Sequence, residues 1–254
     1  MTEKFALNNS GTQTQNDLLY KQQMEMFFNE ACGSNIDKLN NFSRFTSRQS
    51  LSIFLAKNEI FHHILPIHGH IIECGVFMGG GLFTWAQLSA IYEPINHGRK
   101  VIGFDSFKGF PELGDKDVGD GATSEHKIKG AYKFEHITEL KKNIELFDLN
   151  RNLGHIDKVE LVKGDALKTI PQYMAENQHL VVALLYLDFD LYEPTKAALK
   201  HFLPRMPKGA VIAFDELNQK QWPGETLAVL EELGINNIRI QRVPYTPSLS
   251  YAIL

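Results

Sequence analysis

Cysteine is scarce in this sequence, and its scarcity excludes the disulfide-stabilised classes of small secreted protein. The 254 residues contain two cysteines, Cys32 and Cys74, which is too few for a disulfide framework. This count fits a reducing compartment, and we predict a cytoplasmic protein. Cys74 lies inside an apolar run, where a small buried thiol is ordinary core packing.

Long apolar runs and a surplus of basic residues are missing as well. No apolar stretch approaches the roughly 18 residues of a membrane span. The polar N-terminus, MTEKFALNNSGTQTQND, has no apolar signal-peptide core, and we expect no membrane partner. The net charge is -4, and the basic residues form no stripe of the kind that duplex-binding surfaces usually show. We therefore expect no nucleic acid partner.

The sequence does contain a series of short apolar runs that alternate with helical patterns. Continuous Val, Ile and Leu runs suit strands buried on both faces, and their alternation with helices is typical of a doubly wound, parallel α/β sheet. The predicted strands are 70–74, 100–105, 158–165, 180–190, 209–215 and 238–243, with the final SYAIL as an antiparallel edge strand. The predicted helices between them are at about 80–92, 134–149, 166–176, 193–203 and 224–234.

The part of the chain before residue 70 has a different pattern. Residues 1–16 are rich in Asn, Gln, Thr and Ser and are expected to be mobile. Helices are predicted over 17–33 and about 47–65, and the second stops before Pro66. The apolar residues at helical spacing in this second helix are Leu51, Phe54, Leu55, Ile60, Phe61 and Ile64.

The length of the chain suits one α/β domain with a sizeable core. We predict a single domain over 17–254 that follows a flexible 1–16. Within it, 17–69 form a helical cap and 70–254 form the α/β core.

Acidic residues stand at the ends of four predicted strands. In parallel α/β sheets, ligands bind at the carboxyl ends of the strands. One acid there is unremarkable, but four sets form a stronger pattern and indicate a ligand site along this edge. These acids are Glu73, Asp105, Asp188 with Asp190, and Asp215 with Glu216.

The stretch IIECGVFMGGG, residues 71–81, joins the first of these strands to a helix. Its glycines let the backbone approach a ligand closely, and N–H groups at a helix start favour an anionic group. The alternative is a tight strand-to-helix turn without a ligand. The stretch matches neither G-x-G-x-x-G nor G-x-x-x-x-G-K-[ST]. This weakens a dinucleotide dehydrogenase and argues against a P-loop nucleotide hydrolase.

Two further acids admit both a binding and a capping interpretation. Asp105 follows the glycine turn at a distance that suits hydrogen bonds from both hydroxyls of a ribose, or it caps a helix or turn. Asp165, in Gly164-Asp165-Ala166, accepts a hydrogen bond from an adenine amino group or caps the following helix.

A hard divalent cation is predicted beside Asp188 and Asp215. These acids end two apolar strands that should be neighbours, and Glu216 follows at once. Three converging carboxylates repel each other unless a cation lies between them, and Mg²⁺ suits oxygen ligands and keeps waters for a substrate to displace. Asp190 faces the same side as Asp188 if the strand persists. Capping and surface charge are the alternative.

Three other patterns carry less weight. The long loop at about 106–132 is typical of a lid or binding element. Its acids Asp115, Asp117 and Asp120 do not have the spacing of an EF-hand. The histidines of HHILPIHGH, residues 62–70, are interpreted as surface or capping residues. Trp222 precedes a helix start and is a candidate for the wall of a substrate pocket.

Taken in order, five pieces of the sequence resemble the macrocin O-methyltransferase family, which depends on S-adenosylmethionine and Mg²⁺. The resemblance runs from about residue 44 to the C-terminus. Each piece alone would be weak, but together they are specific. The pieces are IIECGVFMGGG, GFDSFKGFP, KGDALKTIP, LLYLDFDLYEPT and VIAFDELNQKQWPGET.

The resemblance implies a fold and a set of roles. The fold would be a class I methyltransferase-like, mostly parallel seven-stranded sheet with an antiparallel last strand and an N-terminal helical extension. Glu73, Gly75 and Gly79 would line the methionine end of the cofactor. Asp105 with Ser106 would hold the ribose, and Asp165 with Ala166 the adenine. The implied Mg²⁺ ligands are Asp188, Asp215 and Glu216, and the implied catalytic bases are Asp188 and Asp190.

The sequence departs from the family at two places. Phe77-Met78 stands where the family commonly has Trp-Arg, and Asp215-Glu216 where it commonly has Asp-Asp. Catechol-type relatives place a lysine three residues after the first metal aspartate, whereas this chain has Leu191.

These observations predict an O-methyltransferase that acts on a hydroxyl of a sugar or glycosylated small molecule. Three alternatives stay open: a phenolic acceptor, an NAD-dependent oxidoreductase or epimerase, and a non-catalytic nucleoside-binding protein. The sequence leaves open whether the protein is a homo-oligomer.

Overall fold

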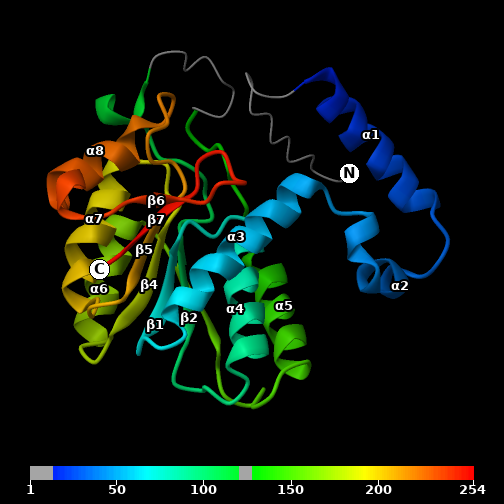
Figure 1. Ribbon diagram of the computed structural model, residues 1–254, viewed down its shortest axis with the longest axis horizontal. Helices are drawn as coiled ribbons and strands as arrows, with labels where there is room; N and C mark the ends of the chain where they lie inside the picture. The colour runs from blue at the N-terminus through cyan, green and yellow to red at the C-terminus, as the bar shows by residue number, and fades with distance from the viewer. Residues whose placement is uncertain (1–13, 120–127) are drawn as a thin grey trace. The chain divides into compact units, whose positions relative to one another are not determined.

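The computed structural model describes residues 14–119 and 128–254 of the chain (Figure 1). The chain divides into two units, one ending at Leu51 and the other spanning Ser52–Leu254.

The first unit is helical. It contains α1 (Gln15–Glu30), α2 (Asn35–Asn40) and the short η1 (Phe42–Arg44). Capping boxes open both α-helices, with the side chain of the N-cap serine or threonine accepting from the backbone of an aspartate three residues later. The prediction of a mobile 1–16 falls mostly outside the described residues, and residues 15 and 16 already belong to α1.

The second unit is built on a seven-stranded sheet in the order β3-β2-β1-β4-β5-β7-β6. The first five strands are parallel, and β7 runs antiparallel to both of its neighbours. This confirms the predicted doubly wound α/β sheet with an antiparallel last strand. The strands are β1 (His70–Cys74), β2 (Val101–Asp105), β3 (Val159–Lys163), β4 (Val182–Leu187), β5 (Val211–Phe214), β6 (Gln241–Arg242) and β7 (Ser250–Ile253).

One detail of the predicted sheet is wrong. SYAIL does not form the edge, because β7 pairs with β5 on one side and with β6 on the other. The edge strand is the two-residue β6, which is too short to leave a long unpaired ladder.

Helices cover both faces of the sheet (Figure 1). On one face lie α3 (Arg48–Ile64), α4 (Gly80–Tyr92) and α5 (Ile137–Leu149), and on the other α6 (Ala166–Glu176), α7 (Tyr192–Phe202) and α8 (Pro223–Glu232). Successive residues of the central strands point to opposite faces, so that Ile71 belongs to one apolar cluster and Ile72 to the other. The short helices η2 (Asp115–Asp117), η3 (Leu203–Arg205) and η4 (Ile235–Asn237) lie in connections.

Helix α3 is where the sequence predicted, but its buried face is only partly the predicted one. Ile60, Phe61 and Ile64 are fully buried, whereas Phe54 and Leu55 are 38% and 54% exposed. The remaining buried positions are Ala56 and Lys57. A lysine therefore lies on the face that apolar periodicity would assign to the core.

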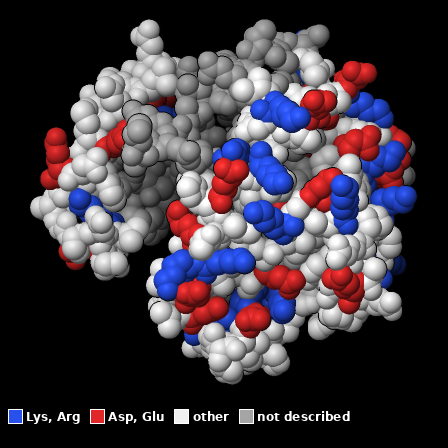
Figure 2. All heavy atoms as spheres, turned by 180° about the vertical axis from the view of Figure 1, so that it is seen from behind, with Lys and Arg blue, Asp and Glu red and all other residues white. Residues whose placement is uncertain are grey.

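The face shown in Figure 2 carries basic and acidic side chains interleaved, without a continuous patch of either sign. Within the described ranges, no helix is long and apolar enough to cross a membrane.

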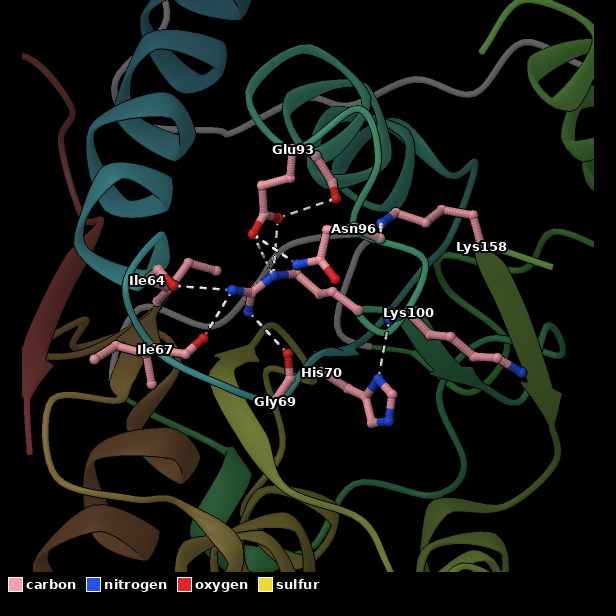
Figure 3. A network of polar contacts seen from close by, with 10 residues as sticks. Ile64, Ile67, Gly69, His70, Glu93, Asn96, Lys100 and Lys158 are labelled. Carbon is pink, nitrogen blue, oxygen red and sulfur yellow. Dashed lines mark hydrogen bonds and ion pairs between the residues drawn. The ribbon is translucent and has the colours of Figure 1, made fainter. Parts of the chain in front are cut away.

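Arg99 joins segments at the amino end of the sheet, and Figure 3 shows its partners Ile64, Ile67, Gly69 and Glu93. Its guanidinium is 3% exposed. It donates to the carboxylate of Glu93 at 2.9 and 3.1 Å and to the carbonyls of Ile64, Ile67 and Gly69 at 2.8–3.0 Å. One side chain thus joins the end of α3, the turn into β1 and the segment after α4.

Replacing this guanidinium tests how much the second unit depends on it. Arg99→Met leaves the Glu93 carboxylate and three backbone carbonyls without their buried donor. We expect the free energy of unfolding to fall by about 3–5 kcal/mol, measured by urea unfolding. Arg239→Met, at an exposed position, is the control, and an equal effect in the two variants would contradict the role assigned to Arg99.

His70 makes the free energy of unfolding depend on pH. Its Nδ1 accepts from the backbone N–H of Lys100 at 3.0 Å. Burial, then the charges of His179 and Lys100, lower the pKa of His70 from 6.5 to about 4. The folded protein therefore binds fewer protons than the unfolded chain in this range. The contribution of His70 to the free energy of unfolding is fully present above pH 6.5 and is lost as the pH falls from 6.5 towards 4.

Replacing His70 should make the free energy of unfolding depend less on pH in the acidic range. In His70→Asn, the free energy of unfolding should fall less between pH 7 and pH 5 than in the parent, by about 1–2 kcal/mol once partial exposure is allowed for. Denaturant unfolding at both pH values measures the difference. His97→Asn, at an exposed position, should leave the slope unchanged; identical slopes in the parent and His70→Asn would refute the prediction.

Candidate active site

The sheet brings the four predicted sets of acids to one edge. Glu73 lies in β1, Asp105 ends β2, and Asp188 and Asp215 directly follow β4 and β5. These strands are parallel and adjacent in the order β2-β1-β4-β5. Their carboxyl ends therefore form a continuous rim, which is where open α/β sheets bind ligands.

The glycine stretch makes the turn from β1 to α4. Gly75 has φ of 101°, and a Cβ there would lie 2.0 Å from the carbonyl oxygen of Asp188. Gly79 has φ of 86° and is the N-cap of α4, without a side-chain cap. A Cβ on the next residue, Gly80, would meet no atom within 4 Å. The start of α4 is thus an uncapped, unobstructed helix N-terminus, the kind of place that attracts a carboxylate or phosphate.

Asp105 shapes this turn. One of its carboxylate oxygens accepts from the backbone N–H groups of Val76 and Phe77, both at 2.8 Å, and the other from Phe107 at 2.6 Å. Phe77 has a left-handed backbone with φ of 48°. The capping alternative for Asp105 is therefore present in the structure. A carboxylate has about four acceptor positions, so one position still suits a ribose hydroxyl, which stays a prediction.

The turn should lose stability when the Asp105 carboxylate is replaced by a group with fewer acceptor oxygens. An asparagine at 105 presents one acceptor oxygen and one donor, so Asp105→Asn leaves at least one backbone N–H of the turn unpaired. We expect a loss of about 2 kcal/mol in the free energy of unfolding, measured by denaturant titration. Asp115→Asn, at an exposed position of the following loop, should change it little; equal stability of both variants would show that Asp105 does not hold the turn.

Asp188 and Asp215 leave the ends of paired strands. Leu187 and Phe214 are register partners, and the N–H of Asp215 donates to the Leu187 carbonyl at 3.1 Å. Burial, followed by the charges of Asp215 and Asp190, raises the pKa of Asp188 well above its usual range. The predicted repulsion between the carboxylates at these strand ends is therefore present.

Asp190 and Glu216 extend this acidic rim. Asp190 has a left-handed backbone with φ of 60°, so it does not continue β4 as the same-side argument assumed. The backbone N–H of Glu216 donates to the buried carboxylate of Glu225 at 3.0 Å. In the part of the chain that the structure describes, no three His, Cys, Asp or Glu side chains are gathered as a ready-made metal site. Metal binding by Asp188, Asp215 and Glu216 thus stays a prediction.

A buried lysine that the sequence analysis missed lies beneath this rim. Lys57 of α3 is 3% exposed, and its Nζ lies 3.6 Å from the ring centroid of Tyr186 and 5.0 Å from that of Trp85. The hydroxyl of Tyr186 in turn donates to Asp215 Oδ1 at 2.6 Å. Since α3 precedes the sheet in sequence, nothing in the local pattern connects Lys57 with the strand ends.

Glu73 is the most enclosed acid of the rim. It is 1% exposed, and burial raises its pKa to about 7 while the charge of Lys57 opposes the rise. Its Oε2 has no hydrogen-bond partner among the described residues. A buried acceptor without a donor is costly, so this oxygen is a candidate contact for a bound cationic group.

The remaining predicted cofactor residues lie in turns and caps. Asp165 is the N-cap of α6 and accepts from the Leu167 N–H at 3.1 Å, which matches the capping alternative. Ala166 is the first residue of α6 and is buried. The hydroxyl of Ser106 donates to the Gly109 carbonyl at 3.2 Å. An adenine or ribose contact of these residues stays a prediction.

Aromatic residues from three segments meet near the acids. Tyr132 contacts Phe77 of the glycine turn and Phe110, and Phe110 contacts Trp222, with ring centroids 5.2–5.8 Å apart. Burial and the charges of nearby acids, Asp190 first, raise the pKa of Tyr132. Trp222 therefore belongs to an aromatic cluster beside the acidic rim, and its role as the wall of a substrate pocket stays a prediction.

The loop that follows β2 is attached to the start of α7 through Asp117. Asp117 is 4% exposed and accepts from the Tyr192 N–H at the start of α7 at 2.6 Å. This residue therefore has a structural role at a helix N-terminus, whereas Asp120 lies outside the described residues. The proposed lid function of 106–132 falls partly on residues that the structure does not describe.

A hollow of about 560 Å³ lies elsewhere, between α3 and the segment around β7. It is lined by Leu55, Asn58, Glu59, His62, His63, Tyr245 and Tyr251. None of the strand-end acids lines it. We therefore place the chemistry at the acidic rim and not in this hollow.

Comparison with known proteins gives consistent matches. The family model described as Macrocin-O-methyltransferase (TylF) matches residues 56–231. Two structures of one protein are similar to the chain. The crystal structure of CalS11, Calicheamicin Methyltransferase, has a TM-score of 0.90 and 32% identity over 95% of this chain and 93% of that one. The apo structure of CalS11, titled TDP-rhamnose 3'-O-methyltransferase, has a TM-score of 0.81 and 31% identity over 95% of both chains.

A curated relative is similar over a shorter range. The 8-demethyl-8-(2,3-dimethoxy-alpha-L-rhamnosyl)-tetracenomycin-C 4'-O-methyltransferase of Streptomyces olivaceus is 30% identical over 155 residues, which are 59% of this chain and 53% of the relative. The chain thus spans about half the length of the curated relatives that it matches.

Proposed function

Since the chain belongs to the macrocin O-methyltransferase family, we propose that it transfers a methyl group from S-adenosylmethionine to a hydroxyl group of a sugar or glycosylated small molecule. One observation supports this proposal most directly. The glycine turn that starts α4 has no side-chain cap, and it lies beside a rim of acids on the neighbouring strands. A sugar acceptor is favoured because CalS11 and the Streptomyces relative are named for methyl transfer to rhamnose or a rhamnosyl product.

The residues around the glycine turn fit the methionine part of S-adenosylmethionine. The uncapped start of α4 suits its carboxylate, since N–H groups and the helix dipole favour an anion there. The unpartnered Glu73 Oε2 suits its ammonium. Asp105 keeps the turn in shape and has one acceptor position left for a ribose hydroxyl.

The donor set at β4 and β5 fits a hard divalent cation. Asp188, Asp215 and Glu216 are the candidate ligands of Mg²⁺, because oxygen ligands in a crowded acidic site suit this ion. Bound there, Mg²⁺ would supply Lewis acidity that lowers the pKa of an acceptor hydroxyl. The Tyr186 hydroxyl occupies one oxygen of Asp215 and leaves the other for this purpose.

Methyl transfer is a displacement in which the acceptor oxygen forms a bond to the methyl carbon as the carbon–sulfur bond breaks. The products are a methyl ether, S-adenosylhomocysteine and a proton. Asp188 and Asp190 are the candidate bases that would take this proton, directly or through water. The larger task of the protein is to hold the oxygen about 3–3.5 Å from the methyl carbon and in line with sulfur.

A phenolic acceptor is the second candidate. The cluster of Phe77, Phe110, Tyr132 and Trp222 beside the acids favours it, since aromatic rings stack on a flat acceptor. The same rings also pack against the apolar face of a sugar. Incubation with labelled S-adenosylmethionine and matched panels of nucleotide sugars, glycosides and catechols distinguishes the two. Labelled product from the sugars alone supports the proposal, and product from the catechols alone overturns the acceptor class.

Two further alternatives have direct tests. Preferential binding of NAD would indicate an oxidoreductase or epimerase. Binding of S-adenosylmethionine without Mg²⁺ binding or turnover would indicate a non-catalytic nucleoside-binding protein. A cytoplasmic location and a homo-oligomeric state belong to the same set of proposals, and size-exclusion chromatography with light scattering measures the second.

Asp188 separates catalysis from cofactor binding. Asp188→Ala removes a metal ligand and a candidate base but no group assigned to the methyl donor. We expect turnover to fall at least about a hundredfold, with calorimetric affinity for S-adenosylmethionine largely unchanged. Asp157→Ala, at an exposed position outside the acidic rim, is the control. Undiminished turnover in Asp188→Ala would refute both roles.

A further inference from the structure

Lys57 is a buried cation that the proposed chemistry does not use. A lysine is rarely fully buried without a partner, yet this one is 3% exposed within α3. Its Nζ faces the rings of Tyr186 and Trp85 at 3.6 and 5.0 Å from their centroids. Such contacts compensate part of the lost hydration of an ammonium group, but they do not explain why a cation is placed here.

The position of Gly81 shows what else Lys57 faces. A Cβ on Gly81 would lie 2.1 Å from Glu73 Oε1 and 2.6 Å from Lys57 Nζ. The carboxylate and the ammonium therefore converge on the same space beneath the first turn of α4. The other carboxylate oxygen, Glu73 Oε2, is buried without a hydrogen-bond partner among the described residues.

Burial and the charges of Asp215 and Asp105 disfavour a charged Glu73 carboxylate, whereas the charge of Lys57 and the side chain of Trp85 favour it. The other titratable groups that interact with Glu73 are Cys74 beside it, Tyr186 in β4 and Asp188 directly after β4.

We propose that Lys57 is a positioning residue whose buried ammonium favours the ionised form of the Glu73 carboxylate, so that Glu73 Oε2 is ready to receive the ammonium group of S-adenosylmethionine. The proposal rests on the proposed function. It assigns α3, which contributes no residue to the sequence motifs, a part in binding the methyl donor.

A purely structural role for Lys57 makes a different prediction. Lost packing would weaken binding by the same factor at every pH and whether or not Glu73 is present. An electrostatic role requires the loss of affinity caused by Lys57→Met to shrink as the pH rises, because Glu73 then ionises without the Lys57 charge. It also requires this loss of affinity to vanish when Glu73 is replaced by a neutral residue.

The test is calorimetric titration of four proteins with S-adenosylmethionine from pH 6.5 to 8.5: the parent, Lys57→Met, Glu73→Gln and the double variant. The amino group of the ligand also titrates here, but it does so equally for every protein, so ratios of Kd remove it. We expect Lys57→Met to weaken binding about tenfold or more at pH 6.5, since one unit of pKa change corresponds to a factor of ten. The ratio should fall towards one at pH 8.5.

The Glu73→Gln background supplies the matched comparison. There, adding Lys57→Met should change Kd little at any pH. A penalty that is independent of pH, or equal in both backgrounds, would overturn the proposal while leaving the proposed function intact. Absence of binding by the parent would instead sink the proposed function, and this inference with it.

Folding offers a second measurement if Lys57→Met proves unstable. Removing one member of a buried charge pair leaves the other uncompensated, whereas removing both is often tolerated. The double variant should then be more stable to urea than Lys57→Met alone. A double variant that is equally unstable or worse would contradict the coupling of Lys57 and Glu73.

Discussion

Repulsion between carboxylates is the constraint on which the arrangement of this protein depends. A parallel sheet directs the ends of β2, β1, β4 and β5 to one edge, and each of these ends carries an acid. Like charges in a partly buried setting disfavour ionisation. The surrounding structure stabilises each acid by a different contact. Backbone N–H groups donate to Asp105, the Tyr186 hydroxyl donates to Asp215, and the charge of Lys57 favours ionised Glu73.

These compensations divide the rim into two halves with different tasks. In the half at β1 and β2, Asp105 and the glycine turn hold each other in place, whereas Glu73 Oε2 has no hydrogen-bond partner among the described residues. The half at β4 and β5 keeps its acids crowded, which raises the pKa of Asp188 and leaves a charge that a cation can answer. The first half suits a methyl donor and the second suits a metal and an acceptor hydroxyl. The departures from the family motif fall in both, with Phe77 facing the aromatic cluster and Glu216 following Asp215.

Much of the fold was predictable because it is encoded locally. The predicted bounds of β1, α4 and α6 coincide with those in the structure, since each is a short apolar run or helix punctuated by glycine or a capping acid. The six-residue α2 was not predicted, because it is too short to show a period, although its Ser34–Asp37 capping box was readable. The central position of β7 depends on pairing between distant segments, which periodicity does not report.

The candidate site was predictable to a smaller extent. Its acids follow strands and can be read from the sequence, whereas Lys57 and Asp117 act through contacts with residues far away along the chain. Lys57 on an apolar face and Asp117 in a polar loop look like ordinary surface residues in sequence. Only the folded chain shows that both are buried beside the elements that form the site.

We propose that the β1–α4 turn is a preformed site for the methyl donor, independent of any metal. Isothermal titration of the unmodified protein with S-adenosylmethionine, once with Mg²⁺ and once with a chelator, tests it most directly. We expect saturable one-to-one binding of similar affinity in both conditions. Absence of binding in both would contradict the assignment of the glycine turn, and binding only with Mg²⁺ would contradict the separation of the two halves of the rim.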